Sequence, residues 1–386
     1  MRATVGVMDT VLIEVFKSDD IYKWDLVPGA DGFQRLTLFE NSSQTMDKVG
    51  RAIQQALDNC RPDAVAIPGW SDAVAVSAIQ WCLANRIPAI VMSETTAWDE
   101  RRSVWKEWIK GRIIKMFAAG LVGGKPHAEY LAKLGMASEQ VVSGYDAVDN
   151  DYFSQKSKEA RLQSSGLRQK FALPENYFLA SARFVEKKNL FNLIRAYAFY
   201  RNLAQKEKRR ESEIWDLVLL GDGRLKPKLC ELIADLGLQK NIVLPGFKQY
   251  VELPAFYALA KAFIHPSTIE QWGLVVNEAM ASGLPVLVSS RCGCAQDLVQ
   301  EGVNGFTFSP NDTQQLAQLM LKISDARFPL SDLGAASAAI IANFGTQQFA
   351  CGMKRAADCA LAVRPKAASA LDKLILSLLA SRRYRE

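Results

Sequence analysis

Glu270 and Glu278 stand eight positions apart in the segment STIEQWGLVVNEAMASGLPVLVSS, among small and apolar residues. The pattern predicts a helix over residues 274–282, and Gly273 allows the turn into it. Glu270 then lies in the loop before the helix, and Glu278 lies about one turn inside it. Carboxylates are seldom buried without polar partners, so two of them here predict a polar ligand.

The start of this predicted helix is a second feature with chemical potential. The first backbone N–H groups of a helix have no partner within it, so those of Gly273, Leu274 and Val275 can hold a phosphate. A phosphate there has a carboxylate on either side, and each carboxylate can accept hydrogen bonds from sugar hydroxyls. The alternative for Glu278 is an exposed helix residue, although its neighbours are not those of a solvated face.

Two cations follow another predicted strand, over residues 177–180. Arg183 comes just after this strand, and Lys188 follows five residues later in ARFVEKKNL. Two positive side chains near a strand end can neutralise a diphosphate. The alternative is a solvated loop before a helix, and position alone does not decide between the two.

A glycine pair, Gly221 and Gly223, follows a predicted strand over residues 216–220. Glycine allows a ligand to approach the backbone closely, so Gly221 is a candidate for donor binding. The alternative is a tight turn from strand to helix. The pair does not form the G-x-G-x-x-G pattern, so a nicotinamide cofactor has no support.

The elements that must position these residues alternate between strands and helices in two successive runs. This alternation predicts parallel βαβ units and an α/β fold of two doubly wound domains that face a cleft. A polar stretch, residues 149–173, interrupts it. We predict an N-terminal domain over 1–155, a donor domain over 156–345, and C-terminal helices over 346–386 that pack back on the N-terminal domain. One apolar face is expected in these helices, formed by Leu371, Leu374, Ile375, Leu378 and Leu379.

Composition narrows the class of protein. The chain has 386 residues, 49% of them hydrophobic, and a formal net charge of +6, which fits a globular protein of two domains. No long basic run suggests nucleic acid, and no apolar run approaches the ~20 residues that cross a bilayer. Seven scattered cysteines and two histidines predict reduced thiols and no metal site. Without a signal-peptide pattern, a cytoplasmic location is expected.

The segment EQWGLVVNEAMASGLPVL resembles the E-x7-E signature of retaining glycosyltransferases of family 4, which have two Rossmann-like domains in the GT-B architecture. Further segments resemble that family in the same order. SARFVEKKNL is similar to its Gly-Arg-Leu-x-x-x-Lys segment, LVLLGDGRLKPKL to its Gly-x-Gly turn, and SSRCGCAQDLVQEGVNGF to its Gly-Gly-x-x-Glu loop. The resemblance covers about residues 140 to 350.

This resemblance implies a role for each candidate. Glu278 would hold the ribose hydroxyls of a nucleotide diphosphate, and Glu270 would contact the transferred sugar. Arg183 and Lys188 would stabilise the departing diphosphate, and the N–H groups at the helix start would meet its distal phosphate. No metal or cofactor is implied, because the cations and the helix dipole neutralise the phosphates.

The first domain departs from the family pattern. Family members usually begin with a strand, a glycine-rich loop and a helix, but TVGVMDTVLIEVF resembles the second strand. The first βα unit is therefore expected to be missing, through truncation or a late start. The family often has a histidine after a middle strand, where IVMSETTAWDE places Glu94. Glu94 and His127 are the acceptor-side candidates, and the alternative for His127 is a helix N-terminal residue without a ligand.

A basic and aromatic segment, DERRSVWKEWIKGRIIKMF, predicts a helix with one face suited to an anionic membrane. A basic tail at residues 382–385 could assist this contact. The alternative is an amphipathic helix that packs on its own sheet with its cations in water. Peripheral contact with the inner face of the membrane would imply a lipid-linked acceptor.

Together these features predict a retaining, metal-independent hexosyltransferase. It would move a sugar from a nucleotide-diphosphate sugar to a glycan, lipid-linked or small-molecule acceptor, in cell-envelope or exopolysaccharide synthesis. The alternative is a nucleotide-binding or scaffold relative that has lost catalysis, which the incomplete first domain favours. A phosphorylase or epimerase on the same fold is less favoured, since no lysine stands out as a cofactor anchor.

Overall fold

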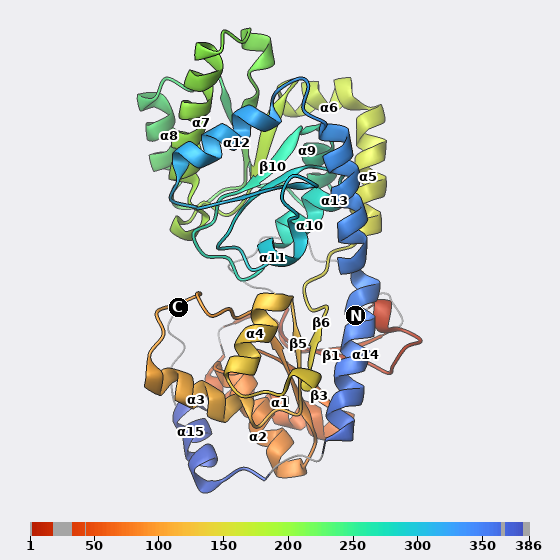
Figure 1. The fold of residues 1–386 in the computed structure, drawn as a ribbon. Coiled ribbons are helices and arrows are strands. Elements are labelled where there is room, and N and C mark those ends of the chain that lie inside the picture. Colours follow the sequence, from red (N-terminus) through yellow and green to blue (C-terminus); the bar gives the residue numbers. More distant parts are fainter. Residues whose placement is uncertain (1, 18–32, 43, 364–366, 381–386) are drawn as a thin grey trace. The chain divides into compact units, whose positions relative to one another are not determined.

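The computed structural model of the chain separates into two compact α/β units (Figure 1). The first unit joins Met1–Asp146 to Thr346–Glu386, and the second is Ala147–Gly345. The division falls before residue 155, where the sequence predicted the first domain to end. At the two ends of the second unit, Val148 and Gly345 pair in an isolated parallel bridge. The structure describes residues 2–17, 33–42, 44–363 and 367–380.

Six parallel strands form the sheet of the second unit, in the order β12-β11-β10-β7-β8-β9. The chain starts in the middle of this sheet, moves outward to β9, and returns to the middle at β10. The order therefore reverses between β7 and β10, and open α/β sheets bind ligands at the carboxyl ends of the strands at such a point. The strands are β7 (Tyr177–Ser181), β8 (Asp216–Leu220), β9 (Ile242–Gly246), β10 (Ala262–His265), β11 (Val286–Ser289) and β12 (Gly305–Phe308).

Helices cover both faces of this sheet, because alternate strand residues feed two separate apolar cores. Phe178, Leu217 and Ile264 belong to a core with α7, α8 and α12. Leu179, Val218 and Phe263 belong to a core with α5, α9 and α10. The helices are α5 (Asn150–Leu162), α6 (Ser164–Phe171), α7 (Leu190–Lys206), α8 (Lys226–Asp235), α9 (Leu253–Leu259), α10 (Leu274–Ala281), α11 (Ala295–Leu298), α12 (Thr313–Ile323) and α13 (Leu330–Ile341).

The polar stretch predicted as a boundary region is helical and forms α5 and α6. Phe153, Ser157 and Ala160 of α5 are buried at spacings of four and three residues, while most of their neighbours face water. One narrow buried stripe is enough to dock α5 against α9 and α10. The polarity of the sequence hid this stripe, and α5 belongs to the second unit from its first residue.

The first unit contains two parallel sheets. Its larger sheet has the order β3-β4-β5-β6, and a separate pair joins β1 to β2. The predicted strand within TVGVMDTVLIEVF is β1. The strands are β1 (Val11–Phe16), β2 (Gln34–Phe39), β3 (Val65–Pro68), β4 (Ala89–Ser93), β5 (Ala119–Val122) and β6 (Val141–Ser143).

Six α-helices lie in the described part of the first unit. The last two come from the C-terminal segment, and α14 packs on β5, β6 and β4 while α15 packs on α2 and α3. Both helices therefore belong to the first unit. The helices are α1 (Met46–Cys60), α2 (Ala73–Asn85), α3 (Val104–Ile114), α4 (Lys125–Lys133), α14 (Thr346–Ala362) and α15 (Ala370–Ala380).

The apolar face predicted for α15 is wrong in its composition. Ile375 and Leu376 are the buried residues of this helix, because they enter the core formed with α2. Leu371, Leu374 and Leu378 are 41%, 55% and 59% exposed and point away from that core. Helix α15 therefore has apolar side chains on two sides, only one of which is covered by described residues.

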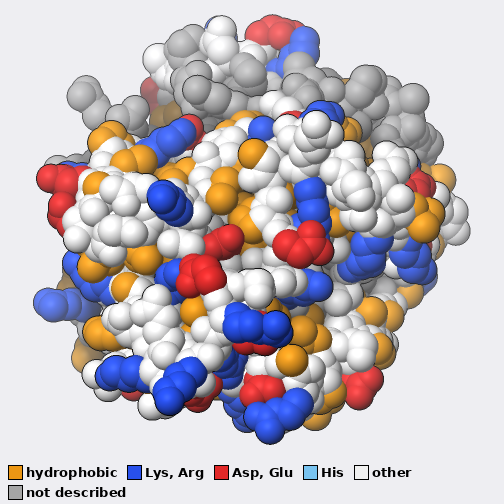
Figure 2. Space-filling model, turned by 90° about the horizontal axis from the view of Figure 1, so that it is seen from above, with side chains coloured by type: hydrophobic (Ala, Val, Ile, Leu, Met, Phe, Trp, Pro, Cys, Tyr) orange, Lys and Arg blue, Asp and Glu red, His pale blue; other side chains and the backbone are white. Residues whose placement is uncertain are grey.

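Charged side chains of both signs are interspersed over the face drawn in Figure 2, with hydrophobic side chains scattered among them. No helix in the described part of the chain is long and apolar enough to cross a membrane. The basic tail predicted at residues 382–385 lies outside the described residues.

Candidate functional site

Glu270 is the centre of a polar cluster at the carboxyl end of β10. Its side chain is 8% exposed, and its Oε2 accepts a hydrogen bond from Ser267 Oγ at 3.2 Å. His265 Nε2 lies 3.2 Å from the same oxygen, and the Lys188 ammonium forms an ion pair with it. Lys188 follows β7, so the cluster spans the point where the strand order reverses. The two sequence candidates Lys188 and Glu270 are thus brought together.

The partners of Glu270 keep it ionised. Burial by itself would raise its pKa, but the hydrogen bond from His265 and the charge of Lys188 outweigh burial and lower the pKa of Glu270. Burial lowers the pKa of His265, so its imidazole is neutral at pH 7 and Nε2 can donate to the carboxylate. The result is a carboxylate held in one orientation by three donors.

His265 was missed as a site residue by sequence reasoning, although the strand that ends with it was predicted. Its ring is 1% exposed, and its Nδ1 has no hydrogen-bond partner among the described residues. The available signal was position, since the last residue of a parallel strand points its polar atoms at the ligand edge of the sheet. Ser267, two residues later, carries the same signal.

The loop that carries Glu270 is fixed by backbone and side-chain contacts. Gly293 N–H donates to the Glu270 carbonyl at 3.0 Å, and Cys294 N–H donates to the Trp272 carbonyl at 3.3 Å. Trp272 is 1% exposed, and its Nε1 donates to Asn277 Oδ1 on α10 at 2.9 Å. The loop that carries Glu270 is therefore tied both to the residues after β11 and to the helix that follows.

Gly273 forms the turn from this loop into α10. Its φ is +109°, which side chains other than glycine rarely tolerate, and a Cβ here would lie 3.2 Å from His265 Nε2. Leu274 and Val275 then begin the helix, as predicted, and Leu274 is 41% exposed. The first N–H groups of α10 thus lie next to the Glu270 cluster, in the position for an anion.

Glu278 lies in the second turn of α10 and is only partly exposed. The Tyr257 hydroxyl donates a hydrogen bond to its Oε2 at 2.6 Å. Burial raises the pKa of Glu278 to about 7, and the Tyr257 hydrogen bond moderates that increase. Its neighbours Asn277 and Met280 are fully buried, which agrees with the expectation that this is no solvated face.

Two tyrosines form an aromatic surface near Glu278. Tyr250 follows β9 and stacks on Tyr152 of α5, with ring centroids 5.0 Å apart. Burial and the negative charge of Glu278 raise the pKa of Tyr250, which is 40% exposed. Neither tyrosine was among the candidates from the sequence.

Gly221 follows β8 and Arg183 follows β7, and these two strands are neighbours in the sheet. A Cβ on Gly221 would lie 1.9 Å from the Ala182 carbonyl oxygen, and its φ is +129°. Gly221 is thus required first of all by the neighbouring backbone, as the tight-turn alternative stated. Arg183 has an exposed side chain just after the end of β7.

In the first unit, Glu94 follows β4 and interacts with Asp146. Asp146 is 5% exposed, and its Oδ2 has no hydrogen-bond partner within the described chain. Burial and the hydrogen bond and charge of Glu94 raise the pKa of Asp146 to about 9. The two carboxyl groups therefore hold a proton at pH 7, at the carboxyl edge of the β3–β6 sheet. Asp146 was not among the sequence candidates.

His127 lies at the start of α4, where its side chain caps the helix. It is fully buried in the first turn of α4, and its Nδ1 accepts a hydrogen bond from Gly124 N–H at 3.2 Å. This contact satisfies one of the free N–H groups at the helix start. The helix N-terminal alternative is therefore the better description of His127.

Comparisons with known proteins agree with the arrangement of the second unit. Residues 166–338 match the family model of glycosyl transferases group 1. Alpha-monoglucosyldiacylglycerol synthase of Acholeplasma laidlawii is 30% identical over 161 residues, which are 41% of this chain and 38% of that protein. Serotype-specific mannosyltransferase WbdA of Escherichia coli is 26% identical over 293 residues, 71% of this chain and 34% of that protein. The chain thus spans well under half the length of these relatives.

Solved structures extend the likeness to most of the chain as a fold. Sucrose-phosphate synthase of Thermosynechococcus elongatus superposes with a TM-score of 0.70 at 17% identity, over 92% of this chain and 90% of that chain. Anabaena HepE in complex with UDP gives 0.66 at 20% identity, over 84% and 85%. The chain, with its two α/β units, therefore has the GT-B fold that the sequence predicted. Residues 166–338, which lie in the second unit, thus match the family of group 1 glycosyl transferases.

Proposed function

We propose that the chain transfers a sugar, with retained configuration, from a nucleotide-diphosphate sugar to a glycan or lipid-linked acceptor. The observation that carries this proposal is the ionised Glu270, with Lys188, His265 and Ser267 on one of its oxygens, next to the start of α10. Cations, a helix N-terminus and an oriented carboxylate are what a diphosphate joined to a sugar requires.

Each residue has one task in the proposed reaction. Glu278 accepts hydrogen bonds from the ribose, and the N–H groups of Leu274 and Val275 hold the distal phosphate. Lys188 and Arg183 stabilise the negative charge that develops as the bond between the anomeric carbon and the phosphate oxygen breaks. A bond from that carbon to the acceptor oxygen forms, and the acceptor proton passes to the departing phosphate.

The acceptor side is proposed from relatives and from the first unit. Relatives include the glycolipid synthase, the mannosyltransferase and an amylovoran biosynthesis glycosyltransferase of Erwinia amylovora. These names support a role in cell-envelope or exopolysaccharide synthesis, on the cytoplasmic side of the membrane. Glu94 stays the acceptor-side candidate, now together with Asp146.

Turnover of a donor panel tests this proposal. UDP-, GDP- and ADP-sugars are incubated with a pool of glycan and lipid-linked acceptors, and release of the nucleotide diphosphate is measured. We expect release with one nucleotide class, lost in Glu278→Ala and in Lys188→Ala. Turnover that Glu278→Ala leaves unchanged would contradict the site. Tight nucleotide binding without turnover of any donor would favour the catalytically impaired relative.

A further inference from the structure

Two contacting helices of the first unit, α3 and α15, expose large apolar side chains. On α3, Val104, Trp105 and Trp108 are 89%, 57% and 53% exposed. On α15, the exposed leucines 371, 374 and 378 recur at helical spacing. Helix α15 packs against α3, and Arg112 of α3 forms an ion pair of 2.6 Å with Asp372 of α15. We call these six apolar residues and their two helices the α3–α15 surface.

This surface differs from the one predicted from sequence. The sequence predicted one amphipathic face for the whole segment, but Ile113 and, after the end of α3, Phe117 are buried in the core with α2. Trp105 and Trp108, with Val104, are the exposed apolar residues of α3. Arg102 and Lys110 form ion pairs with Glu100 or Glu107, and they therefore leave less free positive charge than the sequence suggests.

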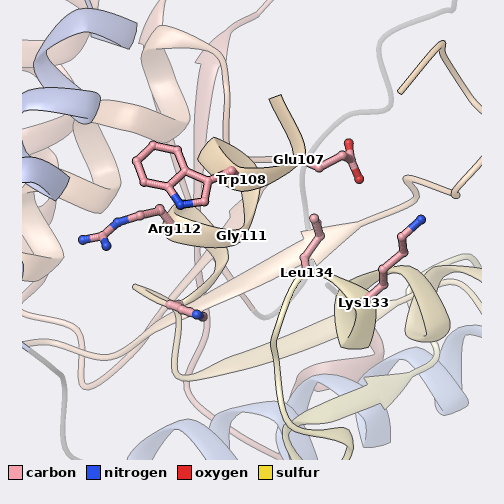
Figure 3. Close-up of a pocket in the computed structure, with 7 residues that line it drawn as sticks. Glu107, Trp108, Gly111, Arg112, Lys133 and Leu134 are labelled. Carbon is pink, nitrogen blue, oxygen red and sulfur yellow. The ribbon is translucent and has the colours of Figure 1, made fainter. Parts of the chain in front are cut away.

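Free positive charge lies instead at the C-terminal end of α3. A pocket of about 350 Å³ there is lined by Trp108, Arg112, Lys115 and Lys133, with Glu107 as its one acid (Figure 3). Figure 3 shows Trp108 and Arg112 on α3 and Lys133 at the end of α4. Among the described residues, Lys115 and Lys133 form no ion pair. The pocket is therefore cationic and shares Trp108 with the apolar surface.

The position of the pocket within the first unit separates it from the acceptor-side candidates Glu94 and Asp146. Helices of parallel βαβ units run opposite to the strands, so the C-terminal ends of α3 and α4 lie at the amino edge of the β3–β6 sheet. Glu94 and Asp146 follow the carboxyl ends of β4 and β6, at the other edge. A ligand in the pocket thus does not compete for Glu94 or Asp146.

We propose that the α3–α15 surface docks the protein on a bilayer of anionic phospholipid, with the pocket receiving a phosphorylated headgroup. Tryptophan favours the boundary between hydrocarbon and headgroups, and lysine beside it complements anionic lipid. The argument for a bilayer rests on this pairing of exposed apolar residues with cations. A protein interface of similar area is depleted in lysine.

Flotation with vesicles tests the surface. The full chain is mixed with vesicles of phosphatidylcholine alone, or of phosphatidylcholine with phosphatidylglycerol, at low and high salt. We expect flotation with the anionic vesicles, weakened by salt. Trp105→Ser with Trp108→Ser should abolish it. Lys115→Gln with Lys133→Gln should weaken it about 25-fold, from about fivefold for each lysine.

Matched controls come from the second unit. Leu162 is 88% exposed on α5, so Leu162→Ser changes an exposed apolar residue elsewhere, and Lys158→Gln with Lys240→Gln removes two exposed lysines. Both controls should float like the unchanged protein. Melting temperature and UDP affinity of every variant report folding and the donor site independently of lipid.

Three results would overturn the proposal. The first is a protein that stays unbound with anionic vesicles. The second is flotation that the tryptophan pair and the lysine pair leave unchanged. The third is self-association, measured by light scattering, that the tryptophan pair abolishes in a protein that binds no vesicles, because the surface then contacts a second copy. None of these results bears on turnover of a soluble donor and acceptor, so the proposed sugar transfer is judged separately.

Discussion

The Tyr257 hydroxyl donates a 2.6 Å hydrogen bond to the Glu278 carboxyl, whose pKa burial raises to about 7. The group proposed to hold ribose is thus only part ionised near neutrality. The ionised form is the stronger acceptor, because hydrogen bonds to charged groups exceed neutral ones. Affinity for the nucleotide should therefore depend on pH.

We expect UDP, GDP or ADP, whichever binds, to bind more tightly as pH rises between about 6 and 8. Tyr257→Phe removes a hydrogen bond that lowers the Glu278 pKa, so the midpoint of this increase should move to higher pH. Glu278→Gln should weaken binding by about 1.5–3 kcal/mol and remove the dependence. Calorimetric titrations at several pH values measure all three. A flat pH profile for the unchanged protein would refute the role of Glu278.

Lys188→Ala should reduce kcat for diphosphate release by about 10²–10³-fold, because it removes positive charge from the departing group. Lys187→Ala is the matched control, since Lys187 is the exposed neighbour and should change kcat little. Release of nucleotide diphosphate is measured for both, with circular dichroism to confirm folding. Equal losses of kcat in the two variants would show that any nearby positive charge has this effect, and would contradict a specific role for Lys188.

His265→Ala should make turnover more sensitive to acid. His265 helps to hold the Glu270 pKa below its ordinary value of 4.5, so ionised Glu270 adds stability above that pH and loses it as pH falls. Without His265 the pKa of Glu270 rises, and the acidic limb of the turnover profile should move to higher pH. Turnover and melting temperature are followed from neutral to acid pH. An acidic limb that does not move would contradict the assigned contact.

Gly221→Ala should destabilise the second unit by about 1–3 kcal/mol, because a Cβ meets the Ala182 carbonyl oxygen at 1.9 Å and the residue is held at positive φ. Gly166→Ala is the matched control on α6, where a Cβ has no atom within 4 Å. That change should stabilise by about 0.5–1 kcal/mol, since alanine favours a helix. Urea unfolding measures both. Equal changes in the free energy of unfolding would contradict the steric conflict between a Cβ at position 221 and the Ala182 carbonyl.

Asp146→Asn should stabilise the first unit at alkaline pH. Burial and Glu94 raise the Asp146 pKa to about 9, so the protonated form adds stability at low pH and loses it as pH rises toward that value. The neutral amide should gain about 1–3 kcal/mol at pH of about 9 and much less near pH 5. Asp63→Asn, an exposed change in the same unit, is the control. Parallel pH profiles of melting temperature for the two variants would refute the buried proton.

The donor unit was predictable because its signals are local. Strands β7, β8, β10 and β11 are continuous apolar runs, and the polar residues that follow β7 and β10 mark the edge where ligands bind. Glu270 and Lys188 were identified on this basis and meet in the structure. The contacts between these residues could not be predicted. They depend on the order of the strands, which places β7 beside β10, and no single segment of the sequence specifies that order.

Misses in the first unit have a similar cause. The exposure of Leu374 and the burial of Leu376 on α15 depend on where α2 and α3 lie, and a helical wheel contains no information about them. His127 stands at the start of a helix, where the same residue can cap the helix or reach a ligand. Only the position of Gly124 N–H decides between the two. No motif marks Asp146. Its pKa is raised by burial and by Glu94, a residue 52 positions earlier in the chain.

The bridge between Val148 and Gly345 makes the second unit a closed loop of chain inserted into the first. The chain enters and leaves the second unit at neighbouring residues, so the whole segment that carries the proposed donor site could be exchanged as one piece. Its ends are neighbours, so a cassette from a relative could be spliced in without lengthening the connections. Recombination could exchange the choice of donor in a single event, while the helices that follow Thr346 keep the acceptor half intact.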